Sequence, residues 1–357
     1  MKKMILAISV LALLFSCTKE VNHDIQARDA AQAVDISNAS SLNRQTKFGA
    51  MLGGGFTNAK NLSMAKSLNV GYVRFAIIMS EWKGKSLPYE SYTANGVKVL
   101  LNVNNSLYTG GAAFPKDLTS YRQKLTEITN TYQPEIIAVE NEEINDNYHR
   151  GSMADYINML KVALEVCHAK NIKVTNGGIY GTGLEVLTYR YLQTKGQSRA
   201  DSFANNCMEL YQIKAAQTPG KNATLEAEVR RVDSLLNFYG NLDYVNLHLY
   251  EPFAPAIYKD ASKAAQVTTS TPVVIADLQE YIIARTGKQA MTNEIGQRNN
   301  TSGDLVNSVQ TELDRLKFPY AIWFTSDGIG YAEPLYDLKT GTLYPNGAAF
   351  SNFLETY

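Results

Sequence analysis

Two glutamates stand at the ends of short apolar or β-prone runs, and their positions suggest a catalytic pair. The run at positions 136–143 is Ile-Ile-Ala-Val-Glu-Asn-Glu-Glu and contains Glu142. The run at positions 291–296 is Met-Thr-Asn-Glu-Ile-Gly and contains Glu294. An unpaired ionised carboxylate among apolar side chains costs several kcal/mol or shifts its pKa, so acids at the ends of buried strands indicate chemistry.

The composition is that of an ordinary globular protein and excludes some kinds of partner. The chain has 357 residues, of which 45% are hydrophobic and 19% charged, enough for one large domain with a substantial core. Basic and acidic residues both number 34, so the formal net charge is zero. Because nucleic acid is bound through a basic excess, no nucleic-acid partner is predicted.

The first residues predict an export signal followed by a lipid anchor. Two lysines precede an apolar run at positions 4–15, which has the length of a signal sequence rather than of a membrane span. Positions 14–17 are Leu-Phe-Ser-Cys, which resembles the lipobox of bacterial lipoproteins. The resemblance implies that residues 1–16 are a signal peptide and that Cys17 is lipidated. A plain secretory signal with an incidental cysteine is the alternative.

The lipobox resemblance also implies a location in the bacterial cell envelope. The protein would be held to a membrane through the lipid anchor alone, and the lack of aspartate after Cys17 resembles outer-membrane lipoproteins. Residues 17–45 are polar without an apolar period, so a flexible tether is expected there and a folded domain over residues 46–357. A monomer is the default expectation.

Two further cysteines, Cys167 and Cys207, bear on the redox state of the chain. An exported protein can form a disulfide between them, and the sequence does not decide whether it does. Cys167 follows the apolar rhythm of a helix, where a buried free thiol is the commoner outcome. We therefore expect no functional role for either cysteine.

From residue 47 onward, β-prone runs alternate with helix-period stretches, the pattern of parallel βα units. Helices are expected at 58–68, 118–132, 153–170 and 301–316. The predicted strands are 47–52, 71–77, 97–103, 136–142, 173–177, 244–250, 289–294 and 320–325. Eight such repeats predict an α/β fold, the (β/α)8 TIM barrel.

A long connection follows the fifth predicted strand. Positions 179–242 are too many for a structureless loop, so the connection must fold. Helices are expected within it at 188–195, 204–216 and 225–239. The barrel should therefore carry a long helical insertion between strands five and six.

In a TIM barrel, polar residues at the carboxyl ends of the strands lie on the catalytic face. Almost every predicted strand carries such a residue, or an aromatic one, in its last part. These residues are Arg74, 102–105, Asn141, Glu142, His248, Tyr250, Glu294 and Trp323. This set, in this order, resembles clan A of the glycoside hydrolases. Those are retaining TIM-barrel glycosidases whose acid/base follows an asparagine at the end of strand four and whose nucleophile ends strand seven.

The resemblance implies a role for each of these positions. Glu142 resembles the acid/base, Glu294 the nucleophile, and Asn141 the group that holds the 2-hydroxyl of the sugar. The other matches are substrate-binding positions: Arg74 beside the nucleophile, His248 and Tyr250 on strand six, and Trp323 as the floor of the subsite where the bond is cut.

The physical requirements of a retaining glycosidase fit these positions. Two carboxyl groups must lie about 5 to 5.5 Å apart, one to attack the anomeric carbon and one to protonate the leaving oxygen. An arginine such as Arg74 favours the ionised form of Glu294. Once the nucleophile is esterified, Glu142 can lose its proton more easily and act as a base.

The fourth predicted strand departs from the clan pattern. Many members have an aromatic residue before Asn-Glu and a proline after it, whereas here Glu140 and Glu143 stand nearby. If the strand stays extended, Glu140 and Glu142 point to the same side and Glu143 to the other. Glu140 is therefore an alternative acid/base, or else an acid paired with an arginine or a tyrosine.

No metal or cofactor site is predicted. The four histidines, at positions 23, 149, 168 and 248, lack the spacing of a zinc site. The glycines at 53–55 lack the fingerprint of a phosphate-binding loop, and no Gly-x-Ser-x-Gly elbow is present.

The sequence thus predicts a retaining glycoside hydrolase acting on a poly- or oligosaccharide. The alternative is a non-catalytic carbohydrate-binding lipoprotein on the same barrel. Carboxyl groups much farther apart than about 6 Å would favour the binding protein. The sugar, the linkage and exo or endo action depend on loops and do not follow from these motifs.

Overall fold

The computed structural model describes residues 44–52, 57–84, 87–106, 113–250, 260–298, 301–325, 332–337 and 339–356. The predicted signal peptide, Cys17 and the tether up to residue 43 lie outside these ranges, as do the glycines at 53–55. Arg44 and Gln45, the first described residues, bond to the helices at 345–356 and 303–315. Among the described helices, none is both long enough and apolar enough to cross a membrane.

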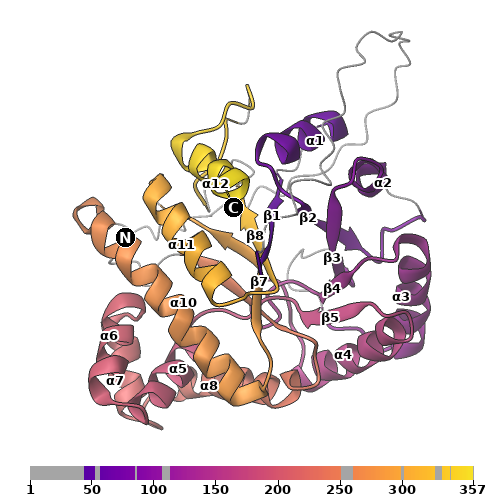
Figure 1. The fold of residues 1–357 in the computed structure, drawn as a ribbon. Coiled ribbons are helices and arrows are strands. Elements are labelled where there is room, and N and C mark those ends of the chain that lie inside the picture. Colours follow the sequence, from indigo (N-terminus) through magenta and orange to yellow (C-terminus); the bar gives the residue numbers. More distant parts are fainter. Residues whose placement is uncertain are drawn as a thin grey trace, which may run out of the picture. The chain divides into compact units, whose positions relative to one another are not determined.

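Eight parallel strands form one sheet that curls into a barrel (Figure 1). They are β1 (Lys47–Met51), β2 (Tyr72–Ile78), β3 (Lys98–Asn104), β4 (Ile136–Val139), β5 (Lys173–Asn176), β6 (Val245–Tyr250), β7 (Ala290–Gly296) and β8 (Tyr320–Phe324). Their order in the sheet is β5-β4-β3-β2-β1-β8-β7-β6. Two isolated parallel bridges, Thr175 to Tyr244 and Ile179 to Leu247, join the segments around β5 and β6. The predicted TIM barrel is confirmed.

Helices alternate with these strands along the chain. They are α1 (Asn58–Ser67), α2 (Leu87–Ala94), α3 (Leu118–Tyr132), α4 (Met153–His168), α5 (Thr182–Gln193), α6 (Gln197–Cys207), α7 (Leu210–Gln217), α8 (Ala223–Tyr239), α10 (Ala264–Thr286), α11 (Gly303–Arg315) and α12 (Pro345–Thr356). A short 3₁₀ turn, η2 (Ala261–Lys263), precedes α10. Asp117, Ser152 and Asn222 begin α3, α4 and α8 because their side chains accept first-turn N–H groups.

The long connection between β5 and β6 is helical, as predicted, and holds α5 to α8. The predicted continuous helix at 204–216 is wrong. Met208 has extended backbone angles, φ −114° and ψ 142°, so α6 ends at Cys207. A capping box between Glu209 and Gln212 then starts α7.

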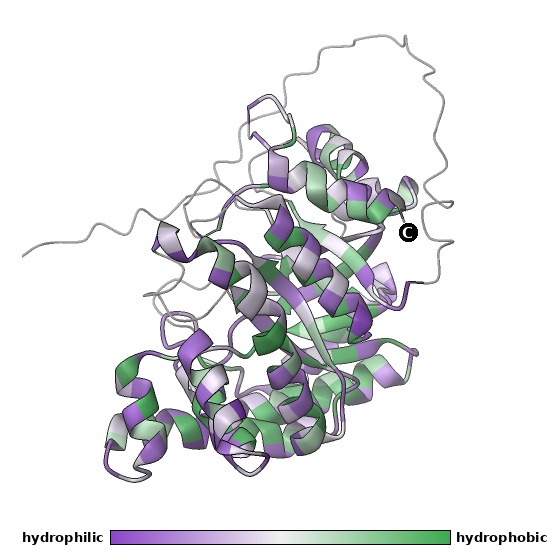
Figure 2. Cartoon of the chain, turned by 60° about the vertical axis from the view of Figure 1, so that its left-hand side comes forward, coloured by the Kyte–Doolittle hydropathy of each residue, from purple (hydrophilic) through white to green (hydrophobic). Residues whose placement is uncertain are grey.

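Apolar side chains pack in two layers, one between the sheet and the helices and one inside the barrel. The interior layer contains Tyr72, Leu100, Ile136, Ala138, Met291, Tyr320 and Ile322. The outer layer includes Cys167 and Cys207, which are buried free thiols rather than a disulfide. Figure 2 shows hydrophobic and hydrophilic residues side by side on the same helices, as expected for helices with one face on a sheet.

An ionic cluster fills the amino-terminal end of the barrel strands. The Glu135 carboxylate accepts hydrogen bonds from Tyr72 (2.9 Å) and Tyr320 (2.6 Å) and pairs with Lys47. Burial alone would raise the pKa of Glu135, but the bonds from Lys47 and the two tyrosines lower it to about 2. Residues at this end of a TIM barrel usually serve stability.

Replacing this glutamate by Glu135→Gln is expected to lower the free energy of unfolding by about 2 kcal/mol at pH 7. The folded pKa lies below the ordinary value of 4.5, so the stabilisation is complete above pH 4.5 and declines towards pH 2. Urea unfolding of both proteins at a series of pH values measures this. A difference that stays constant from pH 7 to pH 3 would contradict the assignment.

Candidate active site

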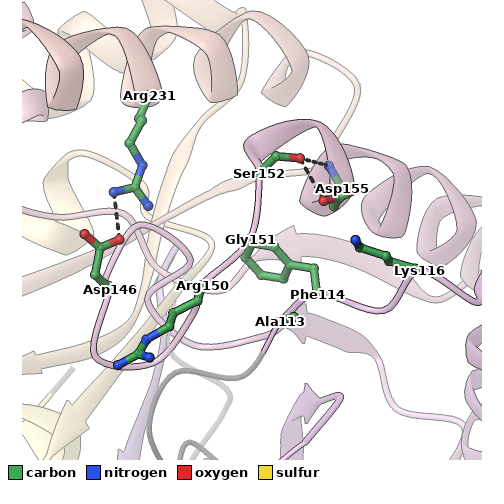
Figure 3. A pocket seen from close by; sticks show the side chains of 9 residues that line it. All are labelled: Ala113, Phe114, Lys116, Asp146, Arg150, Gly151, Ser152, Asp155 and Arg231. Atoms are coloured by element: carbon green, nitrogen blue, oxygen red, sulfur yellow. Dashed lines mark hydrogen bonds and ion pairs between the residues drawn. The ribbon is translucent and has the colours of Figure 1, made fainter.

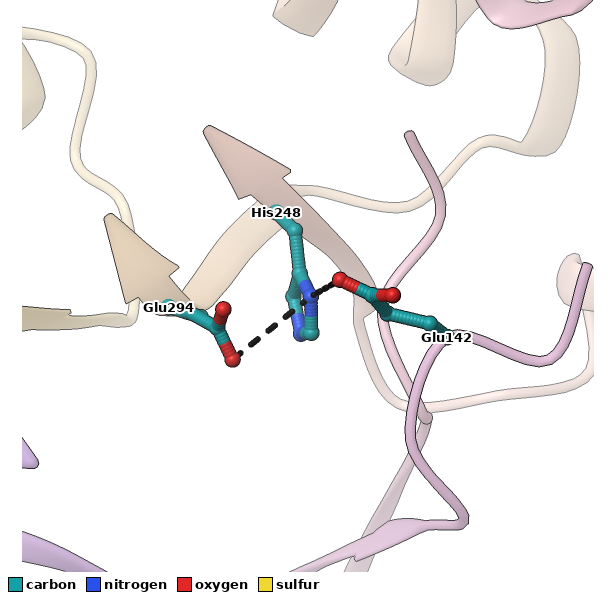
Figure 4. A group of neighbouring side chains, drawn as sticks. All are labelled: Glu142, His248 and Glu294. Atoms are coloured by element: carbon teal, nitrogen blue, oxygen red, sulfur yellow. Dashed lines mark hydrogen bonds and ion pairs between the residues drawn. The ribbon is translucent and has the colours of Figure 1, made fainter. Parts of the chain in front are cut away.

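Glu142, His248 and Glu294 meet at the carboxyl end of the barrel (Figure 4). His248 Nδ1 lies 3.2 Å from Glu142 Oε1 and 3.7 Å from Glu294 Oε2. The facing oxygen of each glutamate and this nitrogen all lie within 4.8 Å of one another. The two carboxyl groups predicted as a pair therefore face each other beside His248.

Strand β4 ends at Val139, so the predicted extension of this strand to residue 142 is wrong. Glu140 and Glu142 both adopt left-handed backbone conformations, with φ 65° and 48°. Such angles are uncommon for residues other than glycine and are concentrated at functional sites. The alternation argument that placed Glu140 and Glu142 on the same side does not apply to this turn.

The turn separates the three acids. Glu140 is 1% exposed, and its carboxyl group accepts the backbone N–H of Asn105 at 2.8 Å. Glu143 is fully buried and accepts hydrogen bonds from Asn176 (2.9 Å) and Tyr239. Of these acids, Glu142 is the one in the group with His248 and Glu294.

The other two glutamates are buried in ways that favour their neutral forms. Burial raises the pKa of Glu140 to about 8, and the bond from Asn105 offsets this only in part. Burial likewise raises the pKa of Glu143. The partner of Glu140 is thus a backbone amide, with His149 Nε2 at 3.9 Å, rather than the predicted arginine or tyrosine.

Glu294 is held as an anion by its neighbours. Arg74 Nη1 donates to Glu294 Oε2 at 2.5 Å, and the Tyr250 hydroxyl donates to Oε1. Burial alone would raise the pKa of Glu294, but His248 and Arg74, with the hydrogen bonds of Tyr250 and Arg74, lower it to about 2. This carboxylate is ionised at neutral pH.

A bulge in β7 positions this glutamate. The register of β7 against β8 shifts between Thr292 and Ile295. The Thr292 hydroxyl donates to the carbonyl of Glu294 at 2.9 Å and accepts its N–H at 3.2 Å. Bulges are frequent beside active sites, where they redirect a side chain.

Arg74 also connects Glu294 to Asn141. Its Nη2 donates to Asn141 Oδ1 at 2.5 Å, and its side chain is almost fully buried. No described residue takes a hydrogen bond from the Asn141 side-chain amide nitrogen, which therefore remains available to a ligand. The predicted neighbours Arg74, Asn141 and Glu294 are thus brought together.

Below the site lies a layer of buried asparagines, of which only Asn102 belongs to the predicted strand ends. Asn293 Oδ1 accepts from Asn246 Nδ2 at 2.8 Å and lies 2.9 Å from His248 Nε2. Asn293 Nδ2 in turn donates to Asn102 Oδ1 at 3.2 Å. The signal in the sequence was an asparagine within each of the predicted strands at 97–103, 244–250 and 289–294.

This layer fixes how His248 is oriented. Because Asn293 Oδ1 is an acceptor, His248 Nε2 carries a hydrogen and Nδ1 faces the two glutamates. Burial alone would lower the pKa of His248, but the charges of Glu294 and Glu142 and the Glu142 hydrogen bond raise it. Gly178 gives the ring its space, since a Cβ there would lie 2.0 Å from Nε2.

The prediction that Trp323 floors a sugar subsite is wrong. Trp323 is 2% exposed and packs against Phe350 of α12, with ring centroids 5.7 Å apart. Side chains alternate along a strand, and Ile322 belongs to the barrel interior, so Trp323 points outward. Phe324, the next residue, lies with its ring 6.3 Å from that of Tyr250.

The group of Glu142, His248 and Glu294 has the ligand types and spacing of a metal site. The spacing of the histidines did not predict a metal site here, because the three residues come from three separate strand ends. The oxygens of Glu294 already accept hydrogen bonds from Arg74 and Tyr250, so a cation would compete with a guanidinium for this carboxylate.

Neither a protein-family model nor a curated protein matches this chain. Among solved structures, the β-glycosidase BGL167 is 12% identical with a TM-score of 0.54, over 84% of this chain and 85% of its own. ZgEngAGH5_4 is 12% identical with a TM-score of 0.52, over 86% and 95%. A GH128 endo-β-1,3-glucanase from Amycolatopsis mediterranei is 12% identical with a TM-score of 0.48, over 86% and 99%. At such identities the likeness to the first two of these structures shows the fold alone.

Proposed function

We propose that this protein is a retaining glycoside hydrolase that cleaves a poly- or oligosaccharide, with Glu294 as nucleophile and Glu142 as acid/base. The observation that carries the proposal is the facing of these two carboxyl groups, with oxygens within 4.8 Å. Retaining enzymes need about 5 to 5.5 Å between the carboxyl groups, and inverting enzymes about 6.5 to 9.5 Å. The barrel shared with glycosidase structures gives further support.

The first step forms a covalent ester. Glu294 attacks the anomeric carbon while the bond to the leaving oxygen breaks, and Glu142 gives its proton to that oxygen. Arg74, His248 and Tyr250 keep Glu294 ionised for the attack. In the second step Glu142 takes a proton from water, the water oxygen bonds to the anomeric carbon, and the ester bond to Glu294 breaks.

The remaining residues bind and position. Asn141, held by Arg74, presents its amide nitrogen to a hydroxyl beside the reacting carbon. His248 Nδ1 can accept a hydrogen bond from protonated Glu142 when the ring is neutral, and can donate to its carboxylate when the ring is charged. Either form keeps the Glu142 carboxyl group turned towards Glu294.

The alternative, a non-catalytic carbohydrate-binding protein, was expected to separate the two carboxyl groups by much more than about 6 Å. The observed approach of the two groups favours the enzyme. A binding protein also has no need for a carboxylate held ionised by an arginine and a tyrosine beside a second acid.

Hydrolysis of a panel of polysaccharides and aryl glycosides by the purified protein, with and without EDTA, tests the function. Activity that survives EDTA and is lost in both Glu142→Gln and Glu294→Gln supports the proposal. Glycan binding without turnover, insensitive to both changes, would establish the binding protein instead. Activity that is abolished by EDTA and restored by a metal would show instead that Glu142, His248 and Glu294 bind a metal ion needed for the reaction.

We also propose that Cys17 anchors the chain to a membrane of a bacterial cell envelope, on the sequence pattern alone. Labelling of expressing bacteria with a fatty acid should mark the wild-type protein and leave Cys17→Ala unlabelled. Equal labelling of both proteins, or of neither, would contradict the anchor.

The Tyr250 hydroxyl and the Trp323 ring should differ sharply in their effect on catalysis. Tyr250→Phe removes a hydrogen bond to the charged nucleophile and is expected to lower kcat roughly 10- to 100-fold. Trp323→Phe changes a side chain in the helix layer and should leave kcat within about twofold, because it touches no reacting group. Rates per folded molecule measure both; a larger loss in Trp323→Phe would restore Trp323 to the site.

A further inference from the structure

A pocket of about 530 Å³ opens beside the segment that follows Glu142 (Figure 3). Three cations line it from three different parts of the barrel. Lys116 precedes α3, Arg150 precedes α4, and Arg231 belongs to α8. Figure 3 shows Lys116 and the Arg231–Asp146 pair on opposite sides of Phe114 and Gly151.

The floor of this pocket contacts the turn that follows β4 and contains Asn141 and Glu142. The Phe114 ring stacks on His149, with centroids 4.8 Å apart and planes 17° apart. A Cβ on Gly151 would lie 2.5 Å from this ring, so only glycine lets the backbone rest on it. His149 Nε2 lies 2.8 Å from the carbonyl oxygen of Asn141. The pocket and the candidate active site therefore share one packed wall.

A second link runs through the loop itself. Asn145 Nδ2 donates to Glu142 Oε2 at 2.8 Å. The next residue, Asp146, pairs with Arg231 at 2.9 Å on the rim of the pocket. The segment 142–146 thus connects Glu142 to the rim of the pocket, along which a saccharide chain bound at Glu142 can extend.

The charges in the pocket do not balance. Asp146 is paired with Arg231, and Asp155 accepts the Ser152 hydroxyl at 2.8 Å in the first turn of α4, where a carboxylate is favoured. Lys116 and Arg150 form no ion pair within the part of the chain that the structure describes. The pocket lining thus has one net positive charge, from three cations and two carboxylates, and Lys116 and Arg150 are its cations without an ion pair among the described residues.

We propose that this pocket is a subsite for an anionic sugar unit, carrying a carboxylate or a sulfate ester, in the saccharide bound at Glu142 and Glu294. The inference rests on the proposed function and narrows its substrate class. The volume lies within the usual range of about 300 to 1,000 Å³ for ligand pockets. Lys116 and Arg150 supply N–H donors for the anion, and charge-assisted bonds of this kind are the strong ones.

The pocket discriminates by charge. A neutral sugar offers nothing that Lys116 and Arg150 prefer to water, whereas an anionic saccharide gains oppositely charged partners. Arg150 and Lys116 reach the pocket from separate loops and lie on opposite sides of the Phe114 ring (Figure 3), so each can pair with an anionic group of the saccharide.

Native gel electrophoresis in gels that contain polysaccharide tests the proposal without requiring hydrolysis. The charged probes are alginate and polygalacturonate, which carry carboxylates, and carrageenan and chondroitin sulfate, which carry sulfates; laminarin is the neutral probe. The test variant is Lys116→Gln/Arg150→Gln. The matched control is Lys221→Gln/Arg230→Gln, which removes two exposed cations outside the pocket.

At least one charged polysaccharide should retard the wild type and the control alike. Its dissociation constant should rise about tenfold or more in the pocket variant, and the class of probe retarded distinguishes carboxylate from sulfate. In gels that contain laminarin, the wild type and both variants should be retarded to the same extent. No retardation by any charged probe, or an equal loss in pocket and control variants, would overturn the subsite.

The outcome is independent of the proposed hydrolysis. A protein that cleaves neutral saccharides and ignores all four charged probes keeps the glycosidase and loses the subsite. A protein that binds a charged probe through Lys116 and Arg150 but cleaves nothing keeps the subsite and loses the glycosidase.

Discussion

Glu294→Gln is expected to lower kcat by at least about 10⁴-fold on any substrate the protein cleaves. The amide has nearly the size of the carboxylate but cannot form an ester with the anomeric carbon. In the folded protein this carboxylate is ionised at neutral pH, because His248 and Arg74, with the hydrogen bonds of Tyr250 and Arg74, lower its pKa to about 2. Initial rates with an aryl glycoside, corrected for folded protein by circular dichroism, measure the loss.

Glu135→Gln is the matched control for this variant. Glu135 also accepts tyrosine hydrogen bonds and pairs with a cation inside the barrel, but at the opposite end of the strands. Its kcat per folded molecule should stay within about twofold of wild type. If Glu294→Gln keeps more than about 1% of wild-type kcat while folded, Glu294 is not the nucleophile.

Glu142→Gln should separate substrates by their leaving groups. For a sugar or alkyl leaving group, which needs a proton, kcat/KM is expected to fall roughly 10²- to 10⁴-fold. For a dinitrophenyl glycoside, whose leaving group departs without a proton, kcat/KM should change little. Its kcat should still fall, because Glu142 also acts as the base that activates water in the second step.

Glu140→Gln provides the control for this prediction. Burial raises the pKa of Glu140 to about 8, so this side chain is mostly neutral at pH 7 and the amide keeps its charge and shape. We expect no dependence on the leaving group in this variant. A leaving-group dependence in Glu140→Gln and none in Glu142→Gln would exchange the two roles.

The barrel could be predicted because its signals are local. Strands such as β3 and β8 are short apolar runs between helix-period stretches, and their bounds follow from composition. The polar residues at the strand ends also marked the candidate site, since the fold itself brings these ends together. Glu142, His248 and Glu294 were found in this way.

The errors come from features that depend on tertiary packing. Nothing local requires Glu140 and Glu142 to adopt left-handed angles, and no glycine or proline marks the break between α6 and α7. The asparagine layer depends on the strand register and on the bulge in β7. Trp323 is different, because counting alternate residues from the barrel interior along β8 would have placed it outside.

Trapping of the covalent intermediate tests the central claim most directly. A 2-deoxy-2-fluoro glycoside with an activated leaving group slows both steps but permits the first, so the ester accumulates. Peptide mass spectrometry should find one fluoroglycosyl unit on Glu294 and none in the Glu294→Gln protein. A label on a different carboxylate, or turnover that releases the inverted anomer without any label, would contradict the account.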